Sequence, residues 1–121
     1  HVGLAIDGVA SIGAVALPGL DIVLRSDQPQ RLPPGAPIPR MLVSRSRPAK
    51  EALAVAELLS AELLPMGSAG AKAMAVVRGE AEIYLHTGGQ YEWDSCAPVA
   101  VARAHGLQQP PGPRWLHGDP R

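Results

Sequence analysis

Short apolar runs separated by turn residues dominate the first 25 positions of the chain. Val2–Ile6 is followed by Asp7-Gly8, which favours a hairpin because glycine tolerates the positive φ of a tight turn. A second apolar run covers Val9–Leu17. After the turn pair Pro18-Gly19, a third run covers Asp21–Arg25. This spacing predicts antiparallel strands.

From residue 41 onward, strand-like runs alternate with segments of helical periodicity. The expected strands cover residues 41–44, 62–66 and 81–86, and the expected helices cover residues 49–61, 68–78 and 95–105. Ser68 is expected to cap the second helix, and Gly79 and Gly106 to end the second and third. The first helix has an apolar stripe formed by Leu53, Val55, Ala56, Leu58 and Leu59. The alternation predicts an α/β fold, a mixed sheet covered by helices.

Composition narrows the class of protein. With 121 residues and 46% hydrophobic positions the chain suits one folded domain, expected here over residues 1–107. Residues 108–121 are rich in proline, show no periodicity and are expected to be disordered. A net charge of zero argues against nucleic-acid binding by bulk charge, and the single Cys96 fits a reducing compartment, the cytoplasm. No apolar run reaches membrane-spanning length.

Asp94 is the first candidate for chemistry. It follows a Gly-rich loop and is expected at the start of a helix, where negative charge is favoured. Its carboxylate suits a hard cation such as Mg²⁺, which often shares a site with a substrate phosphate. The alternative, a plain helix-capping aspartate, stays open at this point. One carboxylate does not hold a metal alone, so the sequence supplies only part of such a site.

Two further segments have the composition of anion sites. Gly67-Ser68-Ala69-Gly70 places small residues at a helix start, where backbone N–H groups bind anions, unless it only caps a tightly packed helix. Ser44-Arg45-Ser46-Arg47 follows a strand, and its guanidinium and hydroxyl groups suit phosphate, unless it is a solvated loop. Lys72 is a third possible anion contact, with a surface lysine as the alternative. His86 is expected at a strand end, where it is a candidate contact to a ligand, with a satisfied structural histidine as the alternative. Cys96 is expected in the core.

These segments together resemble the CysQ-type 3′-phosphoadenosine-5′-phosphate phosphatases of the inositol monophosphatase superfamily. The resemblance rests on GSAG at residues 67–70, Trp93-Asp94 at the family's spacing and SRSRP at residues 44–48, and it covers about residues 1–107. It implies the C-terminal half of a layered α/β/α/β fold and Mg²⁺-dependent removal of the 3′-phosphate from 3′-phosphoadenosine 5′-phosphate, a step of sulfate assimilation. It assigns metal binding to Asp94. It assigns substrate contact to Gly67, Ser68, Ala69, His86, Gly88, Gly89 and Gln90.

The earlier motifs of that family are absent from the chain. Paired glutamates and an Asp-Pro-Ile/Leu-Asp-Gly-Thr segment would precede His1, and they carry most of the metal ligands. We therefore expect a fragment that is inactive alone, whose partner is the missing N-terminal half; a homodimer stays open. Two alternatives also remain: an inositol or fructose phosphate phosphatase of the same superfamily, or a non-catalytic nucleotide-binding or interaction module.

Overall fold

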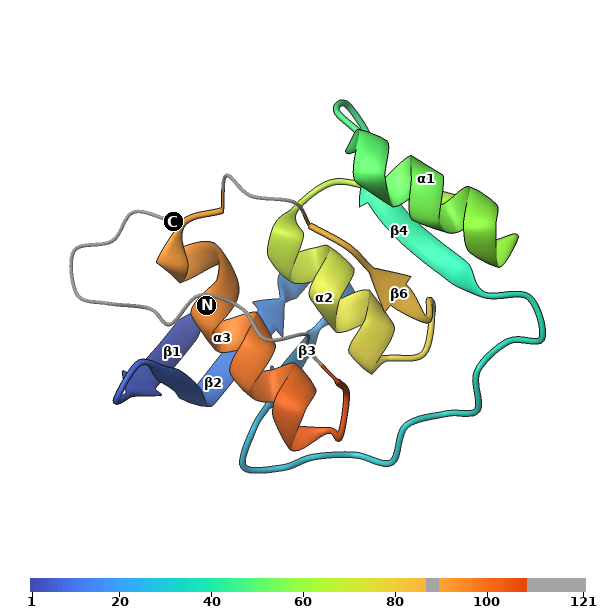
Figure 1. Cartoon of the computed structure of the whole chain (residues 1–121). Coiled ribbons are helices and arrows are strands. Elements are labelled where there is room, and N and C mark those ends of the chain that lie inside the picture. Colours follow the sequence, from blue (N-terminus) through green and yellow to red (C-terminus); the bar gives the residue numbers. More distant parts are fainter. Residues whose placement is uncertain (87–89, 109–121) are drawn as a thin grey trace. The chain divides into compact units, whose positions relative to one another are not determined.

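The computed structural model describes residues 1–86 and 90–108. The chain divides into two compact units: unit 1 comprises residues 1–31 and the segment from residue 89 onward, and unit 2 comprises residues 32–88. Each unit contains one three-stranded sheet (Figure 1), so the predicted mixed α/β class is confirmed. The single domain over residues 1–107 and the disordered tail stay predictions, since residues 109–121 lie outside the described part.

Unit 1 begins with the predicted antiparallel strands. They are β1 (Val2–Ile6), β2 (Val9–Leu17) and β3 (Ile22–Arg25), in the order β1-β2-β3. The first hairpin turns at Asp7 and Gly8, whose φ values of 51° and 75° are both positive, as this turn requires. The second connection contains a short 3₁₀ helix, Pro18–Leu20.

Helix α3 (Glu92–Ala104) completes unit 1 and packs against β1 and β2 (Figure 1). Two glycines, Gly3 and Gly13, lie opposite each other in the strand register and face this helix. A Cβ atom added to Gly13 would lie 2.5 Å from the carbonyl oxygen of Ala97, and one added to Gly3 would lie 2.8 Å from the Ala97 nitrogen. The absence of side chains therefore allows the helix backbone to approach the sheet closely.

The predicted start of α3 is wrong by three residues. The helix begins at Glu92 and is preceded by Tyr91, which makes no side-chain capping hydrogen bond. Because the helix begins earlier than expected, Pro98 lies in its interior. Proline has no N–H group, so the carbonyl oxygen of Asp94 lacks its usual helical donor four residues on. The predicted end holds, since Gly106 follows the helix with φ of 83°.

Unit 2 is a parallel sheet with two crossover helices. Its strands are β4 (Arg40–Ser44), β5 (Glu62–Met66) and β6 (Ile83–Tyr84), in the order β5-β4-β6, and its helices are α1 (Lys50–Leu59) and α2 (Ala69–Val77). Only β6 is much shorter than the sequence predicts. The central strand β4 is buried along its middle, as expected for a parallel strand covered on both faces.

The two helices of unit 2 lie on opposite faces of the sheet. Met41 and Val43 of β4 pack against Ala52 and Ala56 of α1. The intervening Leu42 points the other way and packs against Ala75 of α2. Successive strand residues alternate between faces, so β4 supplies side chains to both cores.

The apolar stripe predicted for α1 is only partly correct. Ala52 and Ala56, one turn apart, are buried, and Val55 packs beside them. Leu53, Leu58 and Leu59 are exposed instead. The four-residue spacing of the alanines places both on the face toward β4 and leaves the bulkier leucines off it. Among the described residues, no helix is long and apolar enough to cross a membrane.

The Pro-rich loop before β4 is held in unit 2 by one ion pair. The Glu82 carboxylate accepts hydrogen bonds from the N–H groups of Ala36 and Arg40 at 2.9 and 2.7 Å, and from the Arg40 guanidinium at 2.7 and 3.1 Å. Arg40 also donates to the carbonyl of Gly79 at 2.8 Å. The Arg40 side chain, with these backbone donors, lowers the pKa of Glu82 to about 2.

This pairing gives the stability of unit 2 a defined dependence on pH. The Glu82 pKa is lower in the folded state than its ordinary value of 4.5. Its stabilising contribution is therefore present above pH 4.5 and lost as the pH falls toward 2. We expect Glu82→Gln to lower the free energy of unfolding at pH 7 by about 1.5–3 kcal/mol, measured by urea denaturation. The same substitution should flatten the loss of stability between pH 5 and pH 2.5.

Glu80→Gln is the matched control. Glu80 pairs with Arg78, but its side chain is about half exposed, so the loss should stay below about 1 kcal/mol. Equal effects of the two substitutions would contradict a specific role for the Glu82 pair.

Candidate functional site

The carboxyl ends of the three strands of unit 2 emerge at one edge of the sheet. Ser44, the last residue of β4, pairs in register with Met66, the last residue of β5. Tyr84 pairs with Leu42, so the chain beyond Tyr84 leaves the sheet at the same edge. The segments that follow these strands start with Arg45, Gly67 and Leu85. We call this region the carboxyl edge of unit 2.

The connections that follow the adjacent strands β4 and β5 lead to opposite faces of the sheet. The chain leaves β4 toward α1 on one face of the sheet and leaves β5 toward α2 on the other. In open α/β sheets, ligands bind outside the carboxyl ends of strands at the point where the connections switch faces. Here that point lies between the segment after Ser44 and the segment after Met66.

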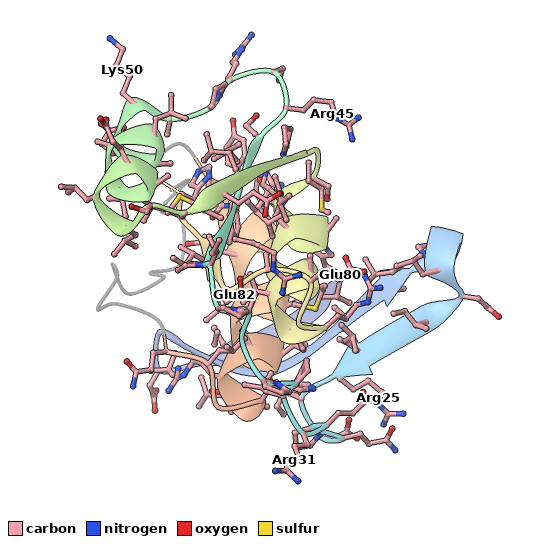
Figure 2. All side chains as sticks on the ribbon, turned by 90° about the vertical axis from the view of Figure 1, so that its right-hand side faces the viewer. Arg25, Arg31, Arg45, Lys50, Glu80 and Glu82 are labelled. Carbon is pink, nitrogen blue, oxygen red and sulfur yellow. The ribbon has the colours of Figure 1, made fainter. Side chains whose placement is uncertain are left out.

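The segment after β4 presents unpaired cations. The N–H of Arg47 donates to the Ser44 hydroxyl at 3.2 Å, which forms a compact turn. Arg45 and Arg47 are exposed, and no carboxylate of the described residues pairs with either. Figure 2 shows the side chains of Arg45 and Lys50 extending outward from unit 2. Guanidinium groups with unused donors in a turn that also holds hydroxyls suit a phosphate.

The segment after β5 is the predicted capped helix start. The Ser68 hydroxyl accepts from the N–H of Ala71 at 3.3 Å, so the predicted cap is confirmed. Ser68 has φ 63° and ψ 124°, a conformation that an L-residue adopts only at a cost. A Cβ atom on Gly67 would meet no described atom within 4 Å, so packing within the described chain does not require a glycine there. Residues 67–69 thus combine an open backbone with a strained cap.

Lys72 is buried rather than on the surface, so the surface alternative is wrong. Only 7% of the residue is exposed. Its ammonium donates to the carbonyl of Met66 at 3.4 Å and lies 5.3 Å from the centre of the Tyr84 ring. Burial lowers the pKa of Lys72. An ammonium has three donors, so a single long hydrogen bond leaves capacity for an anion.

His86 is linked to Lys72 through Tyr84. The Tyr84 hydroxyl lies 3.5 Å from Nδ1 of His86, and the two rings are tilted against each other with centroids 6.3 Å apart. Lys72, Tyr84 and His86 therefore form a continuous polar and aromatic path along the carboxyl edge. The sequence indicated Lys72 and His86 separately. It did not indicate Tyr84. The one feature that could have drawn attention to Tyr84 is its position two residues before His86, on the same face of the predicted strand.

Asp94 belongs to unit 1 and lies in the first turn of α3. It is the third residue of the helix rather than the residue before it, so the alternative of a plain helix-capping aspartate is wrong. Its N–H donates to the carbonyl of Tyr91 at 3.0 Å. The residue is half-buried, and its carboxylate pairs with no cation of the described residues. A negative group in the first turn of a helix is stabilised by the helix dipole.

The Asp94 carboxylate is chemically suited to be one ligand of a Mg²⁺ ion. Carboxylate oxygen is a donor that Mg²⁺ prefers, and one or two carboxylates commonly hold it together with water and substrate phosphate. The described residues contain no cluster of three or more His, Cys, Asp or Glu side chains. A complete metal cluster therefore needs ligands beyond those that this part of the chain brings together.

Glu92 and Cys96 lie on the same turn of α3 as Asp94. One carboxylate oxygen of Glu92 is buried and has no hydrogen-bond partner among the described residues. The sequence did not point to Glu92. Burial, and then the charge of Glu92, raises the pKa of the Cys96 thiol. A raised pKa disfavours the thiolate, so Cys96 is not activated as a nucleophile.

The remaining predicted substrate contacts immediately precede Tyr91 in the sequence. Gly88 and Gly89 are outside the described residues. Gln90 lies in unit 1, where its amide oxygen accepts from the Ser95 hydroxyl at 2.7 Å. Of the predicted residues, Asp94 and Gln90 thus belong to unit 1. The others that are described gather at the carboxyl edge of unit 2: Ser44, Arg45, Arg47, Gly67, Ser68, Ala69, Lys72 and His86.

Comparison with known proteins identifies the family. The model of the inositol monophosphatase family matches residues 1–112. The chain belongs to this family.

Curated relatives confirm the resemblance to the CysQ-type proteins. A 3′-phosphoadenosine 5′-phosphate phosphatase of Mycobacterium leprae (strain TN) is 47% identical over 98 residues, which is 78% of this chain and 36% of the relative. Proteins of the same description from Mycobacterium bovis (strain ATCC BAA-935 / AF2122/97) and Mycobacterium tuberculosis (strain CDC 1551 / Oshkosh) are 43% identical over 98 residues, 78% of this chain and 37% of each relative. The chain thus spans little more than a third of the relatives' length.

Proposed function

We propose that this chain is the C-terminal part of a Mg²⁺-dependent phosphatase that removes the 3′-phosphate from 3′-phosphoadenosine 5′-phosphate. The observation that carries the proposal is the gathering of cationic and small residues at the carboxyl edge of unit 2. Arg45, Arg47 and Lys72 are three cations at one sheet edge beside an open, strained helix start. The descriptions of the relatives support the nucleotide as substrate.

Each residue has a definite task in this proposal. Asp94 binds Mg²⁺ through its carboxylate. When bound, the metal lowers the pKa of a coordinated water and stabilises charge on phosphoryl oxygens. Arg45 and Arg47 neutralise a phosphate group of the substrate, and Lys72 donates from its buried position. Gly67, Ser68 and Ala69 allow the sugar to approach the backbone, and His86, Gly88, Gly89 and Gln90 line the substrate.

An exposed apolar surface on the unit 1 sheet supports the proposal that the N-terminal half of the protein is the partner of this chain. Helix α3 covers one face, and large apolar side chains on the other face are exposed: Val2, Leu4, Ile6, Val9, Ile12 and Val23. An apolar surface of this kind is typically covered by protein. In this proposal the rest of a longer cytoplasmic enzyme of sulfate assimilation covers it. A homodimer through the same face is the competing arrangement.

A substrate panel tests the proposed specificity. Residues 1–108 of this chain replace the matching segment of the Mycobacterium leprae relative, and we call the product the joined protein. We expect it to release phosphate from 3′-phosphoadenosine 5′-phosphate with a kcat/KM at least about tenfold above that for inositol 1-phosphate or fructose 1,6-bisphosphate, because contacts to the nucleotide contribute in the transition state.

Two results of the substrate panel would favour one of the alternative functions over the proposed nucleotide phosphatase. Preference for inositol or fructose phosphate would replace the substrate while keeping the family's chemistry. Binding of the nucleotide without any phosphate release would favour a non-catalytic binding module. Each outcome is measured with the unmodified relative as the reference for folding and activity.

A further inference from the structure

Two of the chain's few aromatic side chains form an exposed stack in unit 1. The sequence contains two Trp, two Tyr and no Phe. The rings of Tyr91 and Trp93 lie 4.4 Å apart between centroids and only 9° from parallel. Tyr91 is 47% exposed and Trp93 is 66% exposed. We call these two residues the aromatic pair.

The aromatic pair does not serve the core of unit 1. The buried hydrophobic side chains there are small or aliphatic, among them Val15, Ala97 and Val101. Each ring of the pair uses one face for the other ring, so the exposed area lies on outer faces and edges. Aromatic faces bind planar π systems, and nucleic-acid bases stack on exposed aromatic side chains in this way.

The position of the aromatic pair is tied to Asp94. Tyr91 immediately precedes α3, and Trp93 is its second residue. The Asp94 N–H bonds to the Tyr91 carbonyl at 3.0 Å, and Nδ1 of His1 lies 3.2 Å from the Trp93 carbonyl oxygen. The aromatic pair and the proposed metal ligand therefore lie within four consecutive residues at the start of α3.

We propose that the purine base of a nucleotide substrate stacks on the aromatic pair, which makes Tyr91 and Trp93 specificity-determining residues. This inference rests on the proposed phosphatase function and refines its substrate class. Inositol and fructose phosphates have no planar π system, so they cannot stack on such a surface as a base does. The pair therefore favours a nucleotide over a sugar phosphate through its base.

Trp93 reports this contact by its own fluorescence. In the full chain carrying Trp115→Phe, Trp93 is the remaining tryptophan. We expect adenosine 5′-monophosphate to quench its emission saturably, while ribose 5-phosphate, which has the same phosphate and sugar without the base, does not. Tyr91→Ala should weaken the nucleotide affinity about tenfold, which corresponds to about 1.4 kcal/mol, and Tyr91→Phe should retain it.

Kinetics of the joined protein separate this inference from the proposed function. Tyr91→Ala should raise KM for 3′-phosphoadenosine 5′-phosphate about tenfold with kcat within about twofold, since stacking contributes equally to substrate and transition state. Quenching that is absent, or equal for ribose 5-phosphate, overturns the stacking. So does an unchanged KM in Tyr91→Ala. Stacking without any phosphate release would instead retain the base contact and overturn the phosphatase function.

Discussion

Replacing Asp94 with asparagine is expected to lower kcat of the joined protein on the order of 10³-fold. The substitution preserves size and the position in the first turn of α3 but removes the charge. A metal ligand contributes several kcal/mol of transition-state stabilisation, and each 1.36 kcal/mol corresponds to a tenfold change in rate. Phosphate release at saturating substrate measures the effect. Calorimetric titration should show weaker Mg²⁺ binding in the same variant.

Glu92→Gln is the matched control for Asp94→Asn. Glu92 lies in the same first turn, so both substitutions remove one negative charge from the start of α3. If the helix dipole alone were responsible, both would have similar small effects, about 0.3–1 kcal/mol each. We expect Glu92→Gln to change kcat by less than about fivefold, which is the change in rate that about 1 kcal/mol produces. Equal losses in the two variants, or full activity of Asp94→Asn, would contradict the role of Asp94 as a metal ligand.

Gly13→Ala is expected to destabilise the chain by about 3 kcal/mol, the upper range for overpacking at a close contact. The new Cβ would lie 2.5 Å from the Ala97 carbonyl oxygen and 3.0 Å from the Ala97 Cα and the Ala100 Cβ. Two of these three atoms belong to the backbone of α3, which cannot rotate away as a side chain does. The helix must shift from the sheet, and Asp94 shifts with it. The midpoint and slope of urea denaturation measure the loss.

Gly19→Ala provides the comparison for Gly13→Ala. Gly19 is also in unit 1, but a Cβ atom there would meet no described atom within 4 Å. Its substitution should change the free energy of unfolding by less than about 0.5 kcal/mol. If Gly13→Ala were as mild as Gly19→Ala, the close packing of α3 on Gly3 and Gly13 would be wrong.

The sequence predicted the elements whose signals are local. The Asp7-Gly8 hairpin, the Ser68 cap and the ends of α2 and α3 each depend on a residue with a strong conformational preference. The start of α3 was misplaced because the helix begins at Glu92 after Tyr91, which makes no side-chain capping hydrogen bond that would mark the start. The buried face of α1 was misread because the two alanines that contact β4 are less hydrophobic than the leucines that stay exposed.

The candidate site was predicted in its parts but not in its arrangement. Small residues and cations indicated the segments after β4 and β5 separately. Their meeting at one edge depends on parallel pairing between Ser44 and Met66, residues far apart in sequence. The burial of Lys72 and its contact with Tyr84 likewise depend on tertiary packing. The functions of Glu82 and Arg40 escaped prediction for the same reason, since they are 42 residues apart.

Mg²⁺-dependent phosphate release tests the central claim most directly: the chain supplies one part of a phosphatase site and needs the other part for activity. The measurement compares three samples with 3′-phosphoadenosine 5′-phosphate as substrate. They are the 121-residue chain alone, the remaining portion of the Mycobacterium leprae relative alone, and the joined protein. We predict release by the joined protein and none by either part. Release by the isolated chain would contradict the partial site, and a folded joined protein that releases no phosphate would contradict the phosphatase function.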